Sequence, residues 1–406
     1  MSVSVNKLAP GDEVAGLGDF IELAGERYYV IRNMDRMPPF FVSVVSADDH
    51  WLFASSMGGL SAGRVSPKTA LFPYVTVDKL HDSAGTAGPK TILRVRGDSA
   101  ARYWEPFNRE QRGLYATSSN LYKNTLGNKL CFEEINHDLA LAFRYTWSTS
   151  AEFGFMRHCE LQNLDTAVVE VDVVDGLQNL LPAGTPLFAQ TNTSNLVDAY
   201  KWTELDEASG LAFLTLYSGI SDRAEPCESL KATTVFSLGV KDPTILISNT
   251  QLDAFRRGEQ LSVEHQRRGI RGAYFVNHSV RLSGQGSSEW RMVLDTERSQ
   301  SDAVELRQRL TSPDVVDAAI TASVQVGSDN LAKIMASADG FQSTAEEHVS
   351  LHHYANVLFN VLRGGIFHDQ YAIPSLDFRD TIKHFNKAAY ERNRSFLLGL
   401  PEALRF

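Results

Sequence analysis

Residues 139–148 read LALAFRYTWS, and residues 167–176 read AVVEVDVVDG. In both stretches β-branched or aromatic residues recur at every second position, and polar residues stand between many of them. This period of two is typical of a β-strand that buries one face against a core. The two stretches therefore predict neighbouring strands of a β domain.

The same pattern extends outward in both directions, from about Tyr28 to Trp290. Further strand-like stretches are YYVIR, FFVSVVS, HWLFASS, KTILRVRG, GLYATSSNLY, ATTVFSLGV and EWRMVLD, and short turn sequences such as Gly127-Asn128 separate them. Many short strands with frequent turns indicate an antiparallel sandwich rather than alternating βαβ units. The zone is about 260 residues long, too long for an immunoglobulin-sized domain. We expect one very large sandwich or two fused ones.

Near residue 300 the hydrophobic period changes from two to about 3.6, which predicts helices. One helix is expected from Ser301 to Leu310, and Ser312-Pro313 begins a second, with a further helical turn that stops at Gly340. Thr344 and Glu347 form an expected capping box before the strongest helix, and a last helix is expected from about Asp377 to Leu400. The prediction is a mainly β protein with a C-terminal α segment: a large antiparallel β-supersandwich over residues 1–298 and a helical linker over 299–406.

The charge of the chain argues against a nucleic-acid partner. Its formal net charge is −10 and its isoelectric point is about 5.6, whereas phosphate binding needs a concentrated basic surface. Basic residues do cluster at Arg256-Arg257 and Arg267-Arg268, but Glu259 and Glu264 interrupt them. A solvated sheet edge explains this cluster better than a phosphate groove does.

Cysteines and apolar segments indicate the compartment. Cys131, Cys159 and Cys227 are far apart and odd in number, so they suggest no disulfide framework and suit a reducing environment. The first residues lack the pattern of a secretory signal, and no window approaches the length of a membrane span. We expect a cytoplasmic protein without a membrane partner.

Tryptophans could stack on sugar rings, because an aromatic face matches the apolar C–H face of a pyranose. Trp147 and Trp290 lie within alternating strands, so we predict them in the core. Trp51 and Trp104 lie beside polar turns, so we predict that these two are the more exposed.

Charged loop segments between strong strands are the candidate carbohydrate-binding sites. Arginine and aspartate side chains offer the multiple hydrogen bonds that sugar hydroxyl groups need, and loops on a rigid scaffold often carry binding groups. Ion-paired turns explain the same segments equally well. The candidate residues are Arg32, Asp35, Arg36, Trp51, Asp78, His81 and Asp82.

No catalytic centre is predicted. Glu133 and Glu134 are adjacent on a strand and point to opposite faces, so they cannot flank one glycosidic bond. Glu152 and Asp175 are the least unsuitable single carboxylates. His352 and His353 lie about 100° apart on a helix, so they do not form a metal-chelating pair. We predict no metal and no cofactor.

Several stretches taken together show a family resemblance. Arg157–Asn163 (RHCELQN) and Val171–Pro182 (VDVVDGLQNLLP), with Trp104–Phe107, Phe153-Gly154 and Phe236–Gly239, resemble the N-terminal sandwich of glycoside phosphorylases in glycoside hydrolase family 94. That family includes cellobiose and β-1,2-oligoglucan phosphorylases and the phosphorylase-like part of cyclic glucan synthases. The resemblance covers about residues 30 to 300 and consists of strand motifs.

The resemblance implies a supersandwich, a following (α/α)6 catalytic barrel and inorganic phosphate as the co-substrate of the parent enzyme. In that family the general acid and the phosphate contacts lie in the barrel, so no catalytic residue is carried over. The chain is expected to be a non-catalytic front region of a β-glucan-processing enzyme. Its expected partners are a β-glucan or oligosaccharide, a C-terminal catalytic domain and a second copy of itself. A free-standing glycan-binding protein and an architectural assembly protein remain alternatives.

Overall fold

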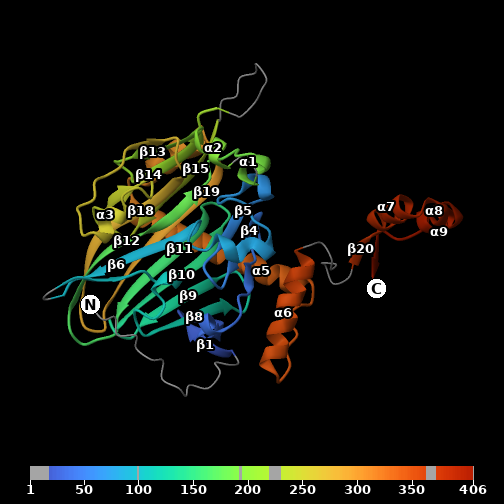
Figure 1. Cartoon of the computed structure of the whole chain (residues 1–406). Coiled ribbons are helices and arrows are strands. Elements are labelled where there is room, and N and C mark those ends of the chain that lie inside the picture. The colour runs from blue at the N-terminus through green and yellow to red at the C-terminus, as the bar shows by residue number, and fades with distance from the viewer. Residues whose placement is uncertain (1–17, 98–99, 192–193, 219–229, 363–371, 406) are drawn as a thin grey trace. The chain divides into compact units, whose positions relative to one another are not determined.

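The computed structural model describes residues 18–97, 100–191, 194–218, 230–362 and 372–405 (Figure 1). These residues fall into two compact units, which divide between Gly327 and Ser328. Strands give way to helices at Ser299, so the first unit contains the β region together with α4 and most of α5. The boundary predicted at residue 298 coincides with this change in secondary structure. That it also separates two domains stays a prediction.

The first unit is built on an eleven-stranded sheet in which each strand pairs antiparallel with its neighbours. Its order is β1 (Asp19–Leu23), β2 (Glu26–Ile31), β8 (Thr117–Asn124), β9 (Leu130–Asn136), β10 (Leu141–Ser150), β11 (Gly154–Asn163), β19 (Ser287–Ser299), β15 (Lys231–Leu238), β14 (Leu211–Leu216), β13 (Lys201–Asp206) and β17 (Gln266–Arg268). The fold class predicted from the period of two is confirmed. Arg267 and Arg268 lie on the edge strand β17, where the sequence predicts a solvated basic edge.

Two smaller antiparallel sheets complete the β region. One has the order β16 (Thr244–Leu246), β18 (Gly272–Leu282), β12 (Val169–Leu180), β6 (Gly88–Val95) and β7 (Arg102–Trp104). The other contains β3 (Phe41–Val44), β4 (His50–Ser55) and β5 (Leu60–Arg64), and the short 3-10 helices are η1 (Met34–Arg36), η2 (Pro67–Thr69), η3 (Val77–Ser83) and η4 (Arg109–Gln111). One buried cluster joins side chains from all three sheets, so they share a single core.

Alternation along β10 shows how this core forms. Phe143, Tyr145 and Trp147 belong to the shared core, whereas Arg144 and Thr146 line a cavity on the other side of the sheet. Burying each large apolar side chain contributes roughly 1.5–3 kcal/mol. Trp147 and Trp290 are buried, as predicted.

Trp104 corrects one prediction, because its side chain is only 1% exposed. Its indole nitrogen donates to the carboxylate of Glu134 at 2.9 Å, so the polar partner beside it lies inside the fold. The turn residues that follow Trp104 in sequence gave no sign of this buried partner.

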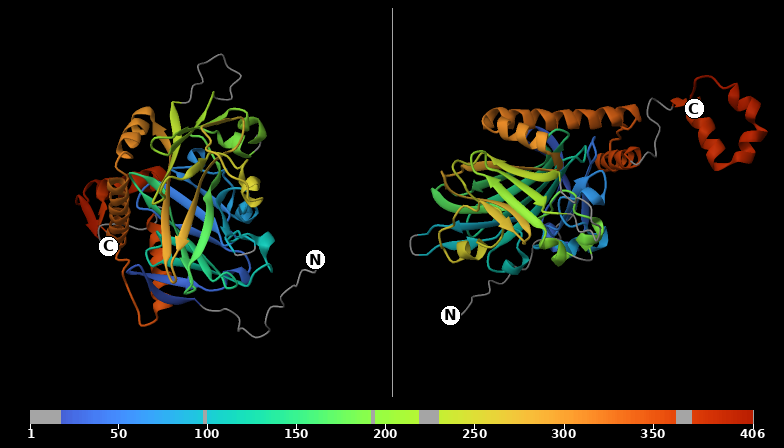
Figure 2. Two further views of the ribbon diagram at one scale, coloured as in Figure 1. Left: turned by 90° about the vertical axis from the view of Figure 1, so that its left-hand side faces the viewer. Right: turned by 90° about the horizontal axis from the view of Figure 1, so that it is seen from above.

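Helices in the β region are short. They are α1 (Leu187–Thr191), α2 (Ser194–Asp198) and α3 (Leu252–Arg256). After β19 come α4 (Gln300–Arg309), which begins one residue earlier than predicted, and α5 (Pro313–Ser337). Val316 and Ile320 of α5 pack with Met156 and Val293 of the large sheet, and Figure 2 shows the long helix alongside that sheet. The further helical turn predicted before Gly340 is the last part of α5, which runs unbroken to Ser337.

The second unit is helical, as predicted, with one short two-stranded sheet. It contains α6 (Glu347–Val361), β20 (Ala372–Pro374), α7 (Ser375–Phe385), α8 (Lys387–Arg392), α9 (Arg394–Leu398) and β21 (Ala403–Arg405). Two predictions are corrected here. The Thr344 hydroxyl accepts from the Glu346 amide instead of capping the α6 N-terminus. Asn386 and Asn393 interrupt the single helix expected over 377–400; the Asn386 side chain caps α8, as short polar side chains compete for backbone groups.

Two predicted properties of the chain can be compared with the structure. Cys131 and Cys159 are free, buried thiols, whereas Cys227 lies outside the described residues. Among the described helices, none has the length and apolar character needed to cross a membrane.

Candidate functional site

A cleft on the first unit gathers polar side chains from both large sheets. It consists of a larger pocket of about 520 Å³ and a smaller one of about 110 Å³. The two pockets adjoin, since they share the lining residues Met57, Glu105, Phe107, Asn108, Arg109 and Gln111. We call this region the Glu105 cleft.

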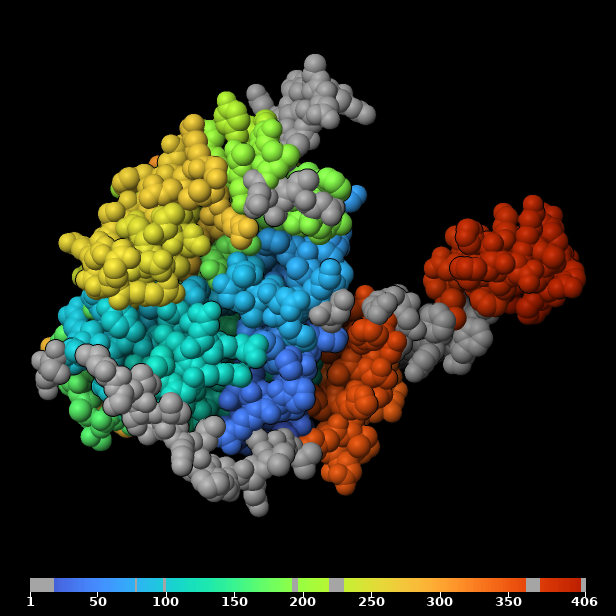
Figure 3. All heavy atoms as spheres, viewed as in Figure 1, coloured from blue at the N-terminus to red at the C-terminus, as the bar shows by residue number. Residues whose placement is uncertain are grey.

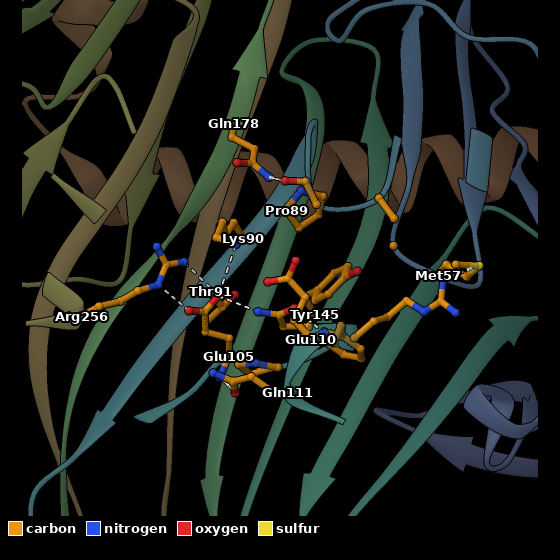
Figure 4. Close-up of a pocket in the computed structure, with 17 residues that line it drawn as sticks. Met57, Pro89, Lys90, Thr91, Glu105, Glu110, Gln111, Tyr145, Gln178 and Arg256 are labelled. Carbon is orange, nitrogen blue, oxygen red and sulfur yellow. Dashed lines mark hydrogen bonds and ion pairs between the residues drawn. The ribbon is translucent and has the colours of Figure 1, made fainter. Parts of the chain in front are cut away.

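Glu105 follows strand β7 and is the charged centre of the cleft. Its carboxylate accepts from Arg256 Nε at 2.6 Å and Nη2 at 3.1 Å, and Lys90 Nζ lies 3.3 Å away. Asn108 Nδ2 donates to the same carboxylate at 3.1 Å. Figure 4 shows these contacts converging on Glu105, and Figure 3 shows residues near 255 (yellow) bordering those near 105 (cyan). The cleft is therefore assembled by contacts between distant parts of the chain.

Ion pairing keeps Glu105 ionised although its side chain is only 6% exposed. Burial alone would raise the pKa of this carboxyl, but the hydrogen bond from Arg256 and the charges of Lys90 and Arg256 bring the pKa below its usual value. Arg256 also pairs with the exposed Asp253 at 2.6 Å. The charges around Glu105 are thus compensated within the fold.

Phe107 forms the apolar wall that both pockets share. Its backbone adopts φ 64°, in the left-handed region that residues other than glycine rarely occupy. The Phe107 amide donates to Glu134 Oε2 at 3.0 Å, and Ser119 Oγ donates to the same oxygen at 3.1 Å. Burial raises the pKa of Glu134, and these donors act against that rise. Of the described non-glycine residues with a positive φ, Phe107 is the one that lines this cleft.

A buried polar network lies under the larger pocket. Thr91 lines the pocket and donates to Asp175 Oδ1 at 2.6 Å. Asp175 also accepts from Arg157 Nη1 at 2.8 Å and from Trp290 Nε1 at 2.7 Å. These contacts fix the floor of the cleft, although Arg157 Nε has no hydrogen-bond partner among the described residues.

The carboxylates weighed and set aside as catalytic candidates have structural partners. Asp175 belongs to this buried network, and Glu152 pairs with Arg309 at 2.5 Å. Glu133 contacts Arg144 at 2.6 Å, whereas Glu134 faces the cleft. The prediction that these two neighbours point to opposite faces is confirmed.

The structure brings one of the predicted binding residues to the cleft. Asp35 lines the smaller pocket, where its carboxylate accepts from the Ser119 amide at 3.4 Å. Arg32 is exposed and lies 3.6 Å from Asp19, and Arg36 is exposed as well. Neither arginine is among the residues that line the Glu105 cleft.

The other predicted binding residues lie away from the cleft lining. Trp51 is half-buried on β4, and its ring meets Tyr74 at a centroid distance of 5.8 Å. Asp78, His81 and Asp82 lie on η3. The His81 Nδ1 atom is 2.7 Å from Ser55 Oγ, Asp82 is exposed, and the side chain of Asp78 is not among those described.

Sequence reasoning missed most of the cleft. The Trp104–Phe107 stretch was noticed only as a strand motif, and Arg256 was assigned to a solvated basic edge. Tyr145 and Gln178 lie within alternating strands, so they read as ordinary sheet residues. The feature that would have pointed to the cleft is that Glu105, next to Trp104, is buried, and burial of a charged residue cannot be read from a single sequence.

No protein-family model and no curated protein matches the chain. Solved structures that are similar to it include a bacterial glucoamylase complexed with acarbose, with 11% identity over 79% of this chain and 41% of that chain, at a TM-score of 0.46. A protein described as a kojibiose phosphorylase from the human microbiome shares 7% identity over 82% of this chain and 36% of that chain, with a TM-score of 0.38.

A protein from Escherichia coli K12 described as an aldose 1-epimerase shares 10% identity over 64% of this chain and 100% of that chain, at a TM-score of 0.30. The chain thus spans less than half the length of the glucoamylase and of the kojibiose phosphorylase. These structures belong to carbohydrate-active enzymes and are distant from this chain, and they decide neither its substrate nor its activity.

Proposed function

We propose that this chain is a non-catalytic, carbohydrate-binding region of a larger β-glucan-processing enzyme of the glycoside phosphorylase type. The observation that carries the proposal is the Glu105 cleft. It combines an apolar aromatic wall with carboxylate, amide, ammonium and guanidinium groups, which together donate and accept hydrogen bonds. A sugar ring presents hydroxyl groups that do both, beside an apolar C–H face.

The contacts of the two carboxylates in the cleft also support binding without catalysis. Glu105 is held in two ion pairs, and Glu134 accepts hydrogen bonds from three donors. Carboxylates engaged in this way are poor general acids or bases, because protonation or proton transfer would break those contacts. In the proposed parent enzyme, a catalytic domain would use inorganic phosphate and this region would help to hold the glycan chain.

Binding of neutral β-linked gluco-oligosaccharides, measured by calorimetry, tests the proposal. Glu105→Gln removes the charge at the centre of the cleft and is expected to weaken binding about tenfold. Asp253→Asn is the matched control, since it removes the other carboxylate that pairs with Arg256 and lies on the exposed side, and we expect unchanged affinity. Thermal melting of both variants separates lost binding from lost folding.

A second assay addresses chemistry. The chain, incubated with β-gluco-oligosaccharides and inorganic phosphate, is expected to release neither glucose 1-phosphate nor reducing sugar. Release of either product by the purified chain would overturn the non-catalytic part of the proposal, and absence of any glycan binding would overturn the rest.

The loops around Arg32–Arg36, Trp51 and Asp78–Asp82 stay a prediction of a second glycan-facing surface. The cytoplasmic location and the homo-oligomer also stay predictions.

A further inference from the structure

Tyr145 has an unusual position at the floor of the larger pocket. It is 3% exposed and lines the pocket, yet its hydroxyl group has no hydrogen-bond partner among the residues that the structure describes. Two other buried tyrosines do have partners: Tyr274 donates to the Gly210 carbonyl at 2.8 Å, and Tyr122 donates to Glu133 at 2.5 Å. The Tyr145 oxygen is not among the fully buried polar atoms that lack a partner, so it is open to the pocket that the residue lines. Its donor and acceptor capacity is therefore free for a ligand.

The ring of Tyr145 is held so that only its hydroxyl end is available. The Arg157 guanidinium lies 4.5 Å from the ring centroid, and Phe132 stacks at 5.1 Å with an interplanar angle of 20°. Phe107 meets the ring edge-on at 5.4 Å. The ring is therefore packed on several sides and cannot stack on a sugar, whereas its hydroxyl can donate one hydrogen bond and accept another. Figure 4 shows Tyr145 among the residues of the pocket.

Arg157 and Asp175 fix the ring from below. Neither side chain of this pair is exposed, and Arg157 Nη1 contacts both Asp175 oxygens at 2.9 and 2.8 Å. Because the guanidinium cannot move without breaking this pair, the tyrosine above it is preorganised. Burial also raises the pKa of the Tyr145 phenol, so it stays protonated and able to donate at neutral pH.

Gln178 supplies a complementary acceptor in the same pocket. Gln178 lines the pocket and is 6% exposed, and its amide nitrogen donates to the Gly85 carbonyl at 2.8 Å, which leaves the amide oxygen as an acceptor. A phenol and an amide oxygen match hydroxyl groups of a ligand.

The charges in the pocket favour an uncharged ligand over an anion. Lys90 and Arg256 are already paired with Glu105 and Asp253, and the exposed neighbours Arg109 and Glu110 carry opposite charges. A phosphate or carboxylate on the ligand would compete with Glu105 and Asp253 for the two paired cations and would lie near the carboxylates of Glu105 and Glu110.

We infer that the Tyr145 hydroxyl, preorganised by the Arg157–Asp175 pair, selects an uncharged sugar by hydrogen bonding to one of its hydroxyl groups. The inference rests on the proposed function and names the ligand class: a neutral saccharide rather than a sugar phosphate or a uronic acid. Tyr145 is a specificity-determining residue of the cleft, and Arg157 and Asp175 position it.

The test uses the full chain and five probes in saturation-transfer NMR titrations and calorimetry. The neutral probes are sophorose, laminaribiose and cellobiose, and the anionic probes are glucose 6-phosphate and glucuronate. We expect at least one neutral disaccharide to bind and neither anion to bind more tightly. Tyr145→Phe keeps every ring contact and removes only the hydroxyl, so its affinity should fall about tenfold with an unchanged melting temperature.

Tyr274→Phe is the matched control. It removes a buried hydroxyl that bonds to Gly210, so it should lower the melting temperature and leave the affinity unchanged. If the unmodified chain binds none of the probes, the proposed function and this inference both fail. If it binds a neutral disaccharide and Tyr145→Phe binds it equally well, only the inference fails. Tighter binding of an anionic probe would overturn the assignment to neutral sugars.

Discussion

Arg157 Nη1 lies 2.9 and 2.8 Å from the two carboxylate oxygens of Asp175, and neither side chain is exposed to solvent. The pair joins two sheets, because Arg157 is on β11 of the large sheet and Asp175 is on β12 of the five-stranded sheet. Trp290 Nε1, Thr91 Oγ1 and Cys159 Sγ also donate hydrogen bonds to the carboxylate. This contact fixes the register between the two layers at one point deep in the core.

Asp175→Asn is therefore expected to cost about 3–5 kcal/mol of the free energy of unfolding, because it leaves the Arg157 charge buried without a counter-charge. Urea denaturation measures the loss. The control is Glu259→Gln, which breaks the exposed Arg257–Glu259 pair and should leave the free energy of unfolding nearly unchanged. Equal, small losses in the two variants would show that the buried pair does not stabilise the sandwich.

His50 makes stability depend on pH. Burial, together with the charge of Arg64, lowers the pKa of this imidazole from 6.5 to about 4. Its Nδ1 atom lies 3.2 Å from Ser46 Oγ, and its Nε2 atom has no partner in the described part of the chain. The charge of Asp49 raises the pKa of His50, and the charge of Arg298 lowers it.

Because the folded state binds the proton more weakly than the unfolded state does, the stability of the fold is fully present above pH 6.5 and is lost as the pH falls toward 4. The loss attributable to His50 should reach about 3 kcal/mol. Urea denaturation at pH 7 and pH 4.5 should show a smaller difference for His50→Gln than for the unmodified chain. His137→Gln, at an exposed position, should leave the difference as it is; the same pH dependence in all three proteins would contradict the prediction.

Gly154 is the first residue of β11, directly after the turn from β10, and has φ 85°. A Cβ there would come within 2.5 Å of the Leu294 carbonyl oxygen and 2.6 Å of the Asp295 Cβ, both on the neighbouring strand β19. Gly25 also has a positive φ, of 76°, but a Cβ would meet nothing within 4 Å. Gly25→Ala should cost about 1 kcal/mol for the backbone conformation alone, whereas Gly154→Ala should cost clearly more. Denaturation of both variants checks the order, and a reversed order would show that β19 adjusts freely.

The β fold was predictable from sequence because its signal is local. Phe143, Tyr145 and Trp147 alternate with polar residues within one strand, and that period alone assigns the strand and its buried face. Helix ends in the second unit were less predictable, since Asn386 interrupts a pattern that is otherwise continuous. Its side chain accepts a hydrogen bond from the Ala389 amide, and the spacing of hydrophobic residues does not predict such a bond.

The cleft could not be predicted in the same way because its contacts are not local. Glu105 and Arg256 are 151 positions apart in sequence and only 2.6 Å apart in space. Each of them reads as an ordinary surface charge until the packing of α3 beside β6 and β7 is known. Tyr145 was predicted correctly as a sheet residue, but the missing partner of its hydroxyl is visible only once all neighbouring side chains are placed.

Trp51 has two possible roles, one in packing and one in binding a glycan. Its ring is half-buried, meets Tyr74 edge-on at 5.8 Å and lies 6.2 Å from Phe53. It also covers Gly63 on the paired strand, where a Cβ would come within 2.7 Å of the indole. Trp51→Ala would leave a hole between these groups, so we expect it to cost about 3 kcal/mol of stability. Because Trp51 does not line the Glu105 cleft, binding of a neutral disaccharide there should be unchanged.

Thermal melting and calorimetry on this variant decide between the two roles. Trp51→Phe serves as the control, because it keeps an aromatic ring against Tyr74 and should lose less stability than the alanine variant. A lower melting temperature with intact affinity assigns Trp51 to packing of the three-stranded sheet. The opposite result, an unchanged melting temperature with weakened oligosaccharide binding, would assign it to a second sugar-binding surface on the loops near β4, since a stacking platform on the surface can be removed without opening the core.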